Sequence, residues 1–217
     1  MYPDAGLELK YDLHMHSKYS RDGVLEPESI VRIAKSRGLS GVAVTDHNTI
    51  LGGLKAKEHE TDDFEAVIGS EIRTERGEII GLFLENDIVS REPFEVMKEI
   101  RNQNGLVVIP HPFDRLRRSR FVPTVDELKL VDCVEVFNSR CLFQRNNEKA
   151  LDFATRSRLR MVAGSDAHFD YEIGNAGIET QSEDLKDAIM KGSVKIFGKR
   201  SPVANYILLR VQEWFMK

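Results

Sequence analysis

Short apolar runs alternate with helix-length amphipathic stretches along most of this chain of 217 residues. The apolar runs predict strands over residues 9–15, 41–45, 66–72, 78–84, 106–109, 133–137, 161–163 and 194–197. Between them, the spacing of apolar residues predicts helices over residues 27–37, 94–102, 145–157 and 185–190. Such alternation is typical of an α/β fold in which helices connect parallel strands and pack outside them.

The composition is that of a globular protein, with 41% hydrophobic and 30% charged residues, and we expect a single domain over residues 1–217. A net charge of −4 argues against a nucleic-acid-binding surface over the whole chain. Two cysteines, Cys133 and Cys141, are too few for a disulfide scaffold. Without a signal peptide or an apolar run of about 18 residues, we expect a cytoplasmic protein with no membrane partner.

Beyond the last strand, apolar residues recur on one side of a predicted C-terminal helix, which we expect to pack on the outside of the fold. These residues are Val203, Ile207, Leu208, Val211 and Phe215.

The positions of the histidines point to function. The chain has six: His14, His16, His47, His59, His111 and His168. All except His59 stand at or just after the end of a predicted strand, whereas His59 in KEHE reads as an exposed helical residue. Because parallel α/β folds bind ligands at the carboxyl ends of their strands, these five imidazoles are expected to converge.

The segment DLHMHS places two of these histidines close together. Strand alternation would put Asp12, His14 and His16 on one face, with Leu13 and Met15 on the other. Two imidazoles so spaced can bind one metal, and Asp12 could orient a ring. The alternative for this segment alone is a pair of hydrogen-bonded core histidines.

Other strand ends add further donors. Glu71 lies in the apolar run AVIGSEI, where a buried carboxylate needs a partner or a metal. Asp166 and His168 in GSDAH repeat the two-residue spacing, and Asn138 ends the run EVFN. Each has a structural explanation when taken alone. Together, nitrogen and oxygen donors without a cysteine suit zinc, manganese or iron.

The motifs DLHMHSKYSRDG, TDHNT, GSEIRT, HP and GSDAH, in this order, resemble those of the PHP (polymerase and histidinol phosphatase) family. The resemblance runs from about residue 10 to about residue 169. It implies a distorted (β/α)7 barrel that holds two or three divalent metals at the carboxyl ends of its strands.

The resemblance also implies a ligand set. The first metal would be bound by His14, His16, Glu71 and Asp166. Glu71 would bridge to a second metal, held also by His111 and Asn138. The third would be held by Asp22, His47 and His168. Asp22 and Asn138 stand where other members carry histidine, and an amide oxygen is the weaker ligand, which puts occupancy of the second site in question.

The reaction best matched to this set is phosphoester hydrolysis by a metal-activated hydroxide, with Glu71, Asp166 and His168 as catalytic residues. No SxxK or GxSxG motif indicates a serine nucleophile. The expected substrate is a small phosphorylated metabolite or a nucleotide. Nucleic acid is expected only as a substrate and not as a binding partner. Arginines suit phosphate groups. The candidates are Arg140, then Arg118 with its neighbours Arg115, Arg117 and Arg120, and Arg73.

Three other functions stay open. An amidohydrolase-type enzyme would also open with HxH, but usually carries a bridging lysine where Glu71 stands here. A non-catalytic PHP module serving a polymerase or another partner would be expected to lose ligands, and this chain keeps them. A purely structural metal protein is disfavoured, because structural sites are usually closed by cysteines.

Overall fold

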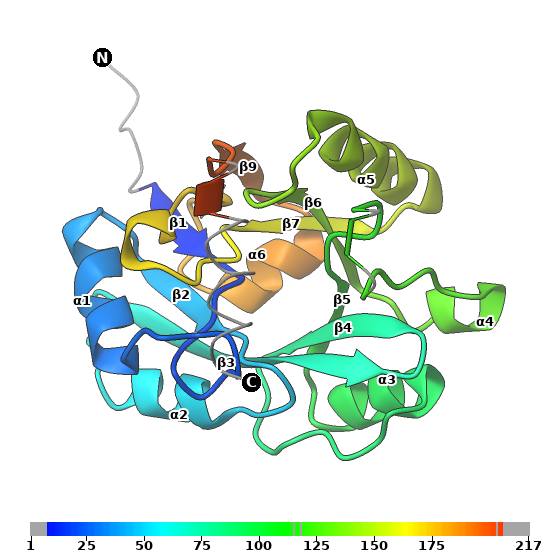
Figure 1. The fold of residues 1–217 in the computed structure, drawn as a ribbon, viewed down its shortest axis with the longest axis horizontal. Coiled ribbons are helices and arrows are strands. Elements are labelled where there is room, and N and C mark those ends of the chain that lie inside the picture. Colours follow the sequence, from blue (N-terminus) through cyan, green and yellow to red (C-terminus); the bar gives the residue numbers. More distant parts are fainter. Residues whose placement is uncertain (1–7, 115, 118, 203, 206–217) are drawn as a thin grey trace.

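The computed structural model describes residues 8–114, 116–117, 119–202 and 204–205 (Figure 1). Its strands are β1 (Leu9–Asp12), β2 (Gly41–Val44), β3 (Glu65–Thr74), β4 (Gly77–Leu82), β5 (Leu106–Ile109), β6 (Cys133–Asn138), β7 (Arg160–Gly164), β8 (Ala176–Thr180) and β9 (Lys195–Gly198). Its helices are α1 (Pro27–Ser36), α2 (Leu51–Lys57), α3 (Pro93–Asn102), α4 (Val125–Leu128), α5 (Gln144–Ser157) and α6 (Leu185–Lys191), with a 3₁₀ turn η1 (Asp170–Glu172). The predicted C-terminal helix from Val203 lies outside the described residues, Ala204 and Asn205 excepted.

The nine described strands form one sheet in the order β7-β6-β5-β4-β3-β2-β1-β8-β9. Seven of them share one direction, and β4 and β8 run against it. The expected α/β barrel is therefore confirmed, but its sheet has nine strands and four antiparallel pairs, where a distorted (β/α)7 barrel was expected. The short connection between Thr74 and Gly77 forces β4 to be antiparallel to β3, since a parallel partner needs a long crossover.

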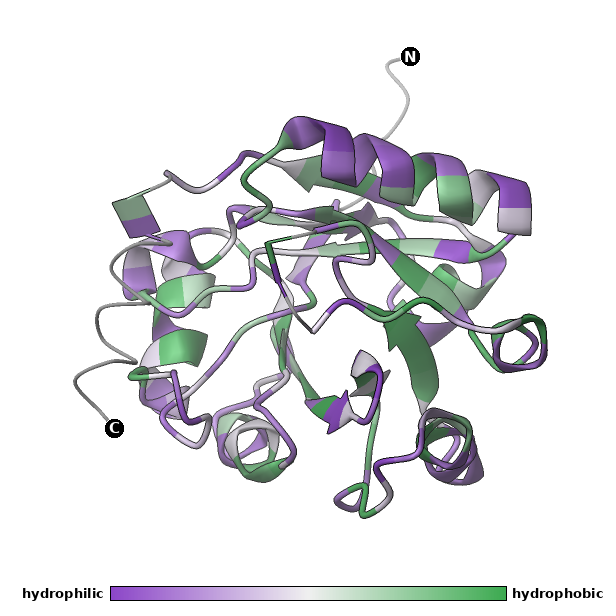
Figure 2. Ribbon diagram, turned by 45° about the vertical axis from the view of Figure 1, so that its right-hand side comes forward, coloured by the Kyte–Doolittle hydropathy of each residue, from purple (hydrophilic) through white to green (hydrophobic). Residues whose placement is uncertain are grey.

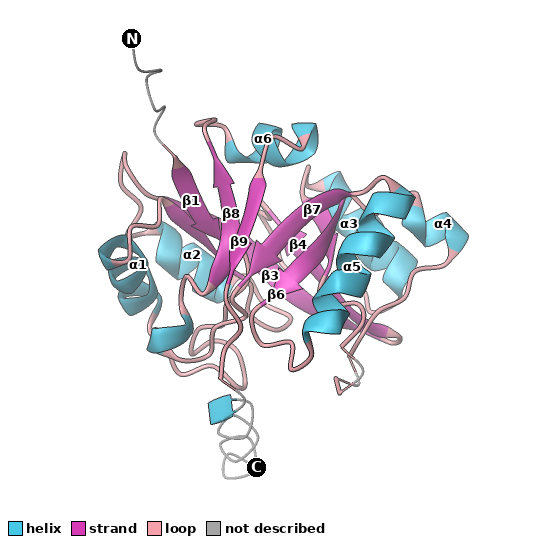
Figure 3. Ribbon diagram, turned by 90° about the horizontal axis from the view of Figure 1, so that it is seen from above, coloured by secondary structure: helices cyan, strands magenta, loops and turns pink. Residues whose placement is uncertain are grey.

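The sheet curls into a nearly closed barrel with the longer helices outside it (Figure 3). A bridge between Met15 and Ala167 joins the chain after β1 to the chain after β7. His16 N donates to the carbonyl of Ala167 at 2.9 Å, and Asp166 N donates to that of His14 at 2.7 Å. This closure places the predicted ligands of the HxH motif, His14 and His16, beside Asp166 near the end of the chain's motifs.

Apolar side chains fill the barrel and the layer between barrel and helices. Tyr11, Leu13, Val67 and Val108 belong to one buried cluster, together with Leu185 of α6. Helix α6 lies at the end of the barrel where β1 begins (Figure 3). Because Leu185 of α6 is buried there, the helix covers that end of the barrel, and the predicted ligands lie at the other end. Figure 2 shows the strands mostly hydrophobic and much of the outer helical surface hydrophilic.

The predicted strand 9–15 is shorter than expected. β1 ends at Asp12, and Leu13 and Met15 pack in different clusters rather than on one face. Asp12 does not orient an imidazole ring. Its carboxylate instead accepts the backbone N–H groups of Ser165 and Gly174, both at 2.8 Å. It therefore anchors the chain after β7 to β1.

Helix α2 and strand β8 were not predicted. The sequence LGGLKAK of α2 has two adjacent glycines, which have low helix propensity. A Cβ at Gly52 would collide with the side chains of Asp46 and Ser17. Glycine is therefore required there, because it lets α2 approach the loops that carry the ligands.

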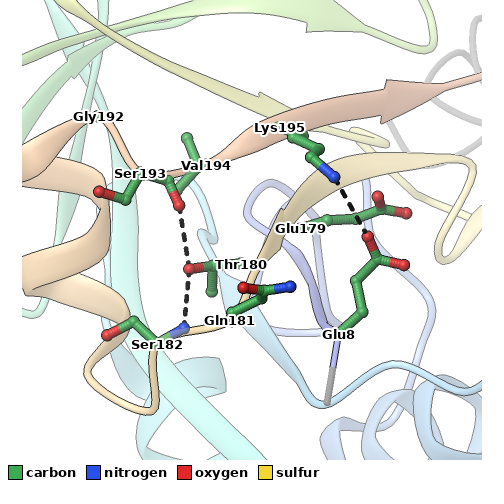
Figure 4. A pocket seen from close by; sticks show the side chains of 9 residues that line it. All are labelled: Glu8, Glu179, Thr180, Gln181, Ser182, Gly192, Ser193, Val194 and Lys195. Carbon is green, nitrogen blue, oxygen red and sulfur yellow. Dashed lines mark hydrogen bonds and ion pairs between the residues drawn. The ribbon is translucent and has the colours of Figure 1, made fainter. Parts of the chain in front are cut away.

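A cavity of about 560 Å³ lies at the opposite end of the barrel from those loops (Figure 4). Thr180 at the end of β8 lines it and pairs with Leu9 at the start of β1, which places the cavity at the amino ends of the parallel strands. Its charged lining residues are Glu8, Glu179 and Lys195. The cavity contains no histidine and is separate from the candidate site. Of the helices in the described ranges, none combines the length and apolar character needed to cross a membrane.

Candidate metal centre

Glu71 lies at the centre of the predicted ligands. It projects from β3, and its Oε1 atom is 2.9 Å from Nε2 of His111. Its Oε2 atom is 3.3 Å from Nδ1 of His47, 3.5 Å from Nε2 of His16 and 3.7 Å from Nε2 of His14. The two oxygens of one buried carboxylate thus face different imidazoles, as a bridging ligand requires.

The histidines of the HxH motif meet the late aspartate across the barrel closure. Oδ1 of Asp166 lies 3.4 Å from Nε2 of His16 and 3.8 Å from Nε2 of His14. The donor atoms of these three buried residues all lie within 4.8 Å of one another. Asp166 adopts a left-handed backbone conformation, with φ of 56°, which is strained for a residue other than glycine.

A further group surrounds Asp22, in the loop after the HxH motif. Its Oδ2 atom lies 3.3 Å from Nε2 of His47 and 3.4 Å from Nε2 of His168. His16 joins Asp22 and His168 in a set of donors within 4.8 Å of one another. The eight predicted histidine, aspartate and glutamate ligands therefore form one continuous cluster.

Hydrogen bonds fix the orientation of several rings. Nδ1 of His14 lies 2.8 Å from Oε1 of Glu135, and Nδ1 of His168 lies 2.8 Å from the carbonyl oxygen of Asp166. In both rings this leaves Nε2 directed toward the cluster. Metal-bound histidines are usually held in this way by a partner on the other ring nitrogen.

The cluster shifts the protonation of its members. Burial alone would lower the pKa of His47, but the carboxylates of Glu71 and Asp22 raise it to about 10. Burial and the neighbouring His168 lower the pKa of His16 to about 4. Burial would raise the pKa of Asp22, but hydrogen bonds from His168 and His47 hold it well below its usual range. The deprotonated carboxylates are in the state that binds metal, whereas His47 would have to release a proton when a metal binds.

The residues present fit a metal. Buried atoms without a hydrogen-bond partner include Nε2 of His14, Oδ1 of Asp166 and Oδ1 of Asp22. Buried polar atoms are normally satisfied, so three such atoms in one cluster indicate a missing partner. All are nitrogen or carboxylate oxygen donors, which suit zinc, manganese or iron.

Asn138 lies beside the cluster but turns its oxygen away. Its Nδ2 atom donates to Oε2 of Glu135 at 3.0 Å and to Oδ2 of Asp166 at 3.1 Å. Its Oδ1 atom accepts the backbone N–H of Arg140 at 2.9 Å. In the opposite amide orientation, the amide oxygen would face two carboxylates and the NH₂ group would face the backbone N–H of Arg140, so neither could form a hydrogen bond. The hydrogen-bond network therefore defines the amide orientation.

The predicted substrate arginines are scattered. The buried guanidinium of Arg140 pairs with Glu172 at 3.0 Å, and its Nη2 atom has no hydrogen-bond partner. Arg73 has an exposed side chain, and Arg118 lies outside the described residues. Arg117, named only as a neighbour of Arg118, lies at the cluster, with Nη2 2.5 Å from Oδ2 of Asp166. His59 is exposed, as predicted, but it lies in the turn after α2 and not in a helix.

Two buried glutamates near the cluster were missed by the sequence analysis. Glu135 contacts His14, and Oε2 of Glu78 lies 3.9 Å from Nε2 of His111. Burial and the charge of Glu71 raise the pKa of Glu78. Both carboxylates interrupt apolar strand sequences, CVEVF and GEIIGL. The argument used for Glu71 would therefore have identified them too.

Comparison with known proteins gives a family. A family model described as the PHP domain matches residues 12–202. An uncharacterized protein of Methanocaldococcus jannaschii is 44% identical over 143 residues, which are 60% of this chain and 82% of that protein. An error-prone DNA polymerase of Cutibacterium acnes is 43% identical over 63 residues, which are 28% of this chain but only 6% of the polymerase.

Solved structures share the fold. A two-domain protein from Bacteroides vulgatus, described as containing a predicted PHP-like metal-dependent phosphoesterase, superposes with a TM-score of 0.75 at 21% identity. The match covers 90% of this chain and 66% of the other, so this chain spans slightly less than two thirds of that protein.

Proposed function

This chain belongs to the PHP family, and we propose that it is a metal-dependent phosphoesterase that hydrolyses phosphomonoesters or nucleotide phosphodiesters. The observation that carries the proposal is the placement of Glu71, which has His111 at one carboxylate oxygen and three further histidines at the other. Such a centre suits adjacent divalent metals, and we expect two or three of them per chain.

Three groups of side chains would hold the metals. The first group is His14, His16, Glu71 and Asp166. The second is Glu71 with His111, and the third is Asp22, His47 and His168. When bound, zinc, manganese or iron would supply Lewis-acid stabilisation of phosphoryl oxygens and a lowered pKa for the attacking water.

The protein itself contributes order and charge. Glu135 and the carbonyl of Asp166 orient the rings of His14 and His168 before any ligand arrives. The pKa values of Asp22, Glu71 and Asp166 lie below their usual range, so these carboxylates are ionised and supply negative charge to the centre. The buried position of Asp166 and Glu71 excludes bulk water from the ligand atoms, which strengthens their electrostatic interactions. Arg140 stays a predicted phosphate-binding residue.

The structure bears on two of the three alternatives, the amidohydrolase-type enzyme and the non-catalytic module. The bridging position is filled by Glu71 rather than by the lysine that an amidohydrolase-type enzyme usually carries. A module kept only for a polymerase would not need all eight ionisable ligands in one cluster. Phosphoester hydrolysis therefore accounts for more of the observed geometry than either alternative.

Substitution of ligands tests the proposal. His16→Ala and Asp166→Ala each remove one donor from the first group, so each should abolish hydrolysis and lower metal content. His59→Ala is the control, because an exposed substitution should leave activity unchanged. Elemental analysis and a screen of phosphomonoesters and phosphodiesters, with amides and lactones alongside, provide the measurements. Cleavage of an amide but of no phosphoester would favour the amidohydrolase alternative instead.

A further inference from the structure

We propose that Arg117 binds the phosphoryl group of the substrate, an inference that rests on the proposed phosphoesterase function. Arg117 lies in the loop after His111 and places Nη2 2.5 Å from Oδ2 of Asp166. It is thus a fixed positive charge directly against a member of the ligand cluster.

The contacts of Arg117 leave part of its guanidinium available. Nε lies 3.4 Å from Oδ2 of Asp114, too far for a good hydrogen bond, and is buried without a hydrogen-bond partner. Nη1 donates no hydrogen bond to any residue in the described ranges. The side chain is 15% exposed, whereas those of Asp114 and Asp166 are fully buried. Arg117 therefore reaches from the buried carboxylates to the solvent side of the cluster.

Asp166 does not depend on Arg117 alone. Its Oδ2 atom also accepts a hydrogen bond from Nδ2 of Asn138 at 3.1 Å, while Oδ1 faces His16 and His14. Asp166 thus stays oriented by Asn138 when the guanidinium turns to another anion. A planar guanidinium matches two oxygens of a phosphoryl group at once, which a single ammonium cannot do.

The other described arginine candidates are less well placed. The side chain of Arg140 is only 2% exposed, against 15% for Arg117, and it pairs with Glu172, which is fully buried and also accepts the backbone N–H of His168 at 3.0 Å. The pair links the turns after β6 and β7 and so supports the position of His168. Arg73 is exposed on β3 and has no contact with the ligands among the described residues.

The test uses the metal-loaded full chain and the variants Arg117→Ala and Arg117→Lys. Arg156→Ala is the control, since this arginine is exposed on α5 and forms its ion pair with Asp152, outside the ligand cluster. Arg117→Ala should lower kcat/KM for a chromogenic phosphomonoester by about 10- to 100-fold and weaken binding of inorganic phosphate similarly. Arg117→Lys should recover only part of both. Metal content should match that of the wild type in both variants. The melting temperature of Arg117→Ala should fall, because Asp114 and Asp166 lose a buried ion-pair partner.

Two results would overturn the assignment. One is wild-type kcat/KM and phosphate affinity in Arg117→Ala. The other is loss of bound metal in both Arg117 variants, which would make Arg117 a positioning residue for Asp166. Calorimetric phosphate binding separates this inference from the proposed function. If the wild type binds phosphate through Arg117 but cleaves no phosphoester, the reaction class is wrong while the role of Arg117 holds.

Discussion

Nδ1 of His14 lies 2.8 Å from Oε1 of Glu135, and the other oxygen of that carboxylate accepts the backbone N–H of His111 at 2.8 Å and Nδ2 of Asn138 at 3.0 Å. One buried glutamate on β6 therefore holds groups that follow β1, β5 and β6 itself. Glu135 is not in the predicted ligand set, yet it contacts three of its members.

Replacing this glutamate should weaken metal binding while leaving the ligands in place. In Glu135→Gln the side chain keeps its size but loses its charge and one acceptor, so it cannot satisfy all three donors. We expect metal affinity to fall about 10- to 100-fold, measured by competition with a chromophoric chelator. Glu148→Gln, at an exposed position on α5, is the control. Unchanged affinity in Glu135→Gln would show that the contact with His14 does not matter.

Asn138→Asp distinguishes a hydrogen-bond donor from a metal ligand. With Nδ2 facing two carboxylates, a third carboxylate there should repel Glu135 and Asp166 and lower the free energy of unfolding of the metal-free protein by about 3–5 kcal/mol. If the oxygen of Asn138 instead bound a metal, the aspartate would strengthen metal binding. Urea unfolding measures the change in the free energy of unfolding, and a metal titration measures the change in metal affinity. Asn86→Asp, at an exposed turn, is the control.

Removing the metals should destabilise the fold. The carboxylates of Asp22, Glu71 and Asp166 lie close together in the buried cluster, and bound metals would balance their charge. A ligand at 100 times its Kd stabilises the folded state by about 2.7 kcal/mol. Calorimetry with a chelator should therefore show a lower Tm that zinc or manganese restores. His59→Ala should respond as the wild type does, and a Tm unaffected by the chelator would argue against a resident metal.

Tyr11 should make stability depend on pH in alkaline solution. Burial raises the pKa of Tyr11 to about 12, against about 10 in an unfolded chain. The unfolded state therefore loses its proton first, so this contribution to stability is full below about pH 10 and is lost as the pH rises toward about 12.

Tyr11→Phe removes the titrating hydroxyl but keeps the ring. We expect its Tm to fall less than that of the wild type between about pH 8 and about pH 11. Parallel curves for the two proteins would show that Tyr11 does not titrate differently on folding. Other titrating groups are common to both proteins and cancel in the difference.

Much of the fold, and the clustering of the eight ionisable candidate ligands, could be predicted from the sequence. The strands predicted over residues 41–45, 78–84, 106–109 and 133–137 correspond to β2, β4, β5 and β6. Hydrophobic periodicity is a local property, and so is the position of a histidine after an apolar run. The direction of parallel strands then places such residues at one end of the barrel, without knowledge of any specific contact.

Tertiary structure alone decided the contacts around those ligands. From the sequence alone, the amide of Asn138 could bind a metal or donate a hydrogen bond. Its orientation is defined by the backbone N–H of Arg140 and the carboxylates of Glu135 and Asp166. Likewise, Arg117 and Arg140 are both arginines near strand-end ligands, but one meets Asp166 and the other meets Glu172. Residue type and spacing in the sequence specify which chemical groups are available at the strand ends. The partners of those groups come from segments distant in sequence, and only the closure of the barrel brings these segments together.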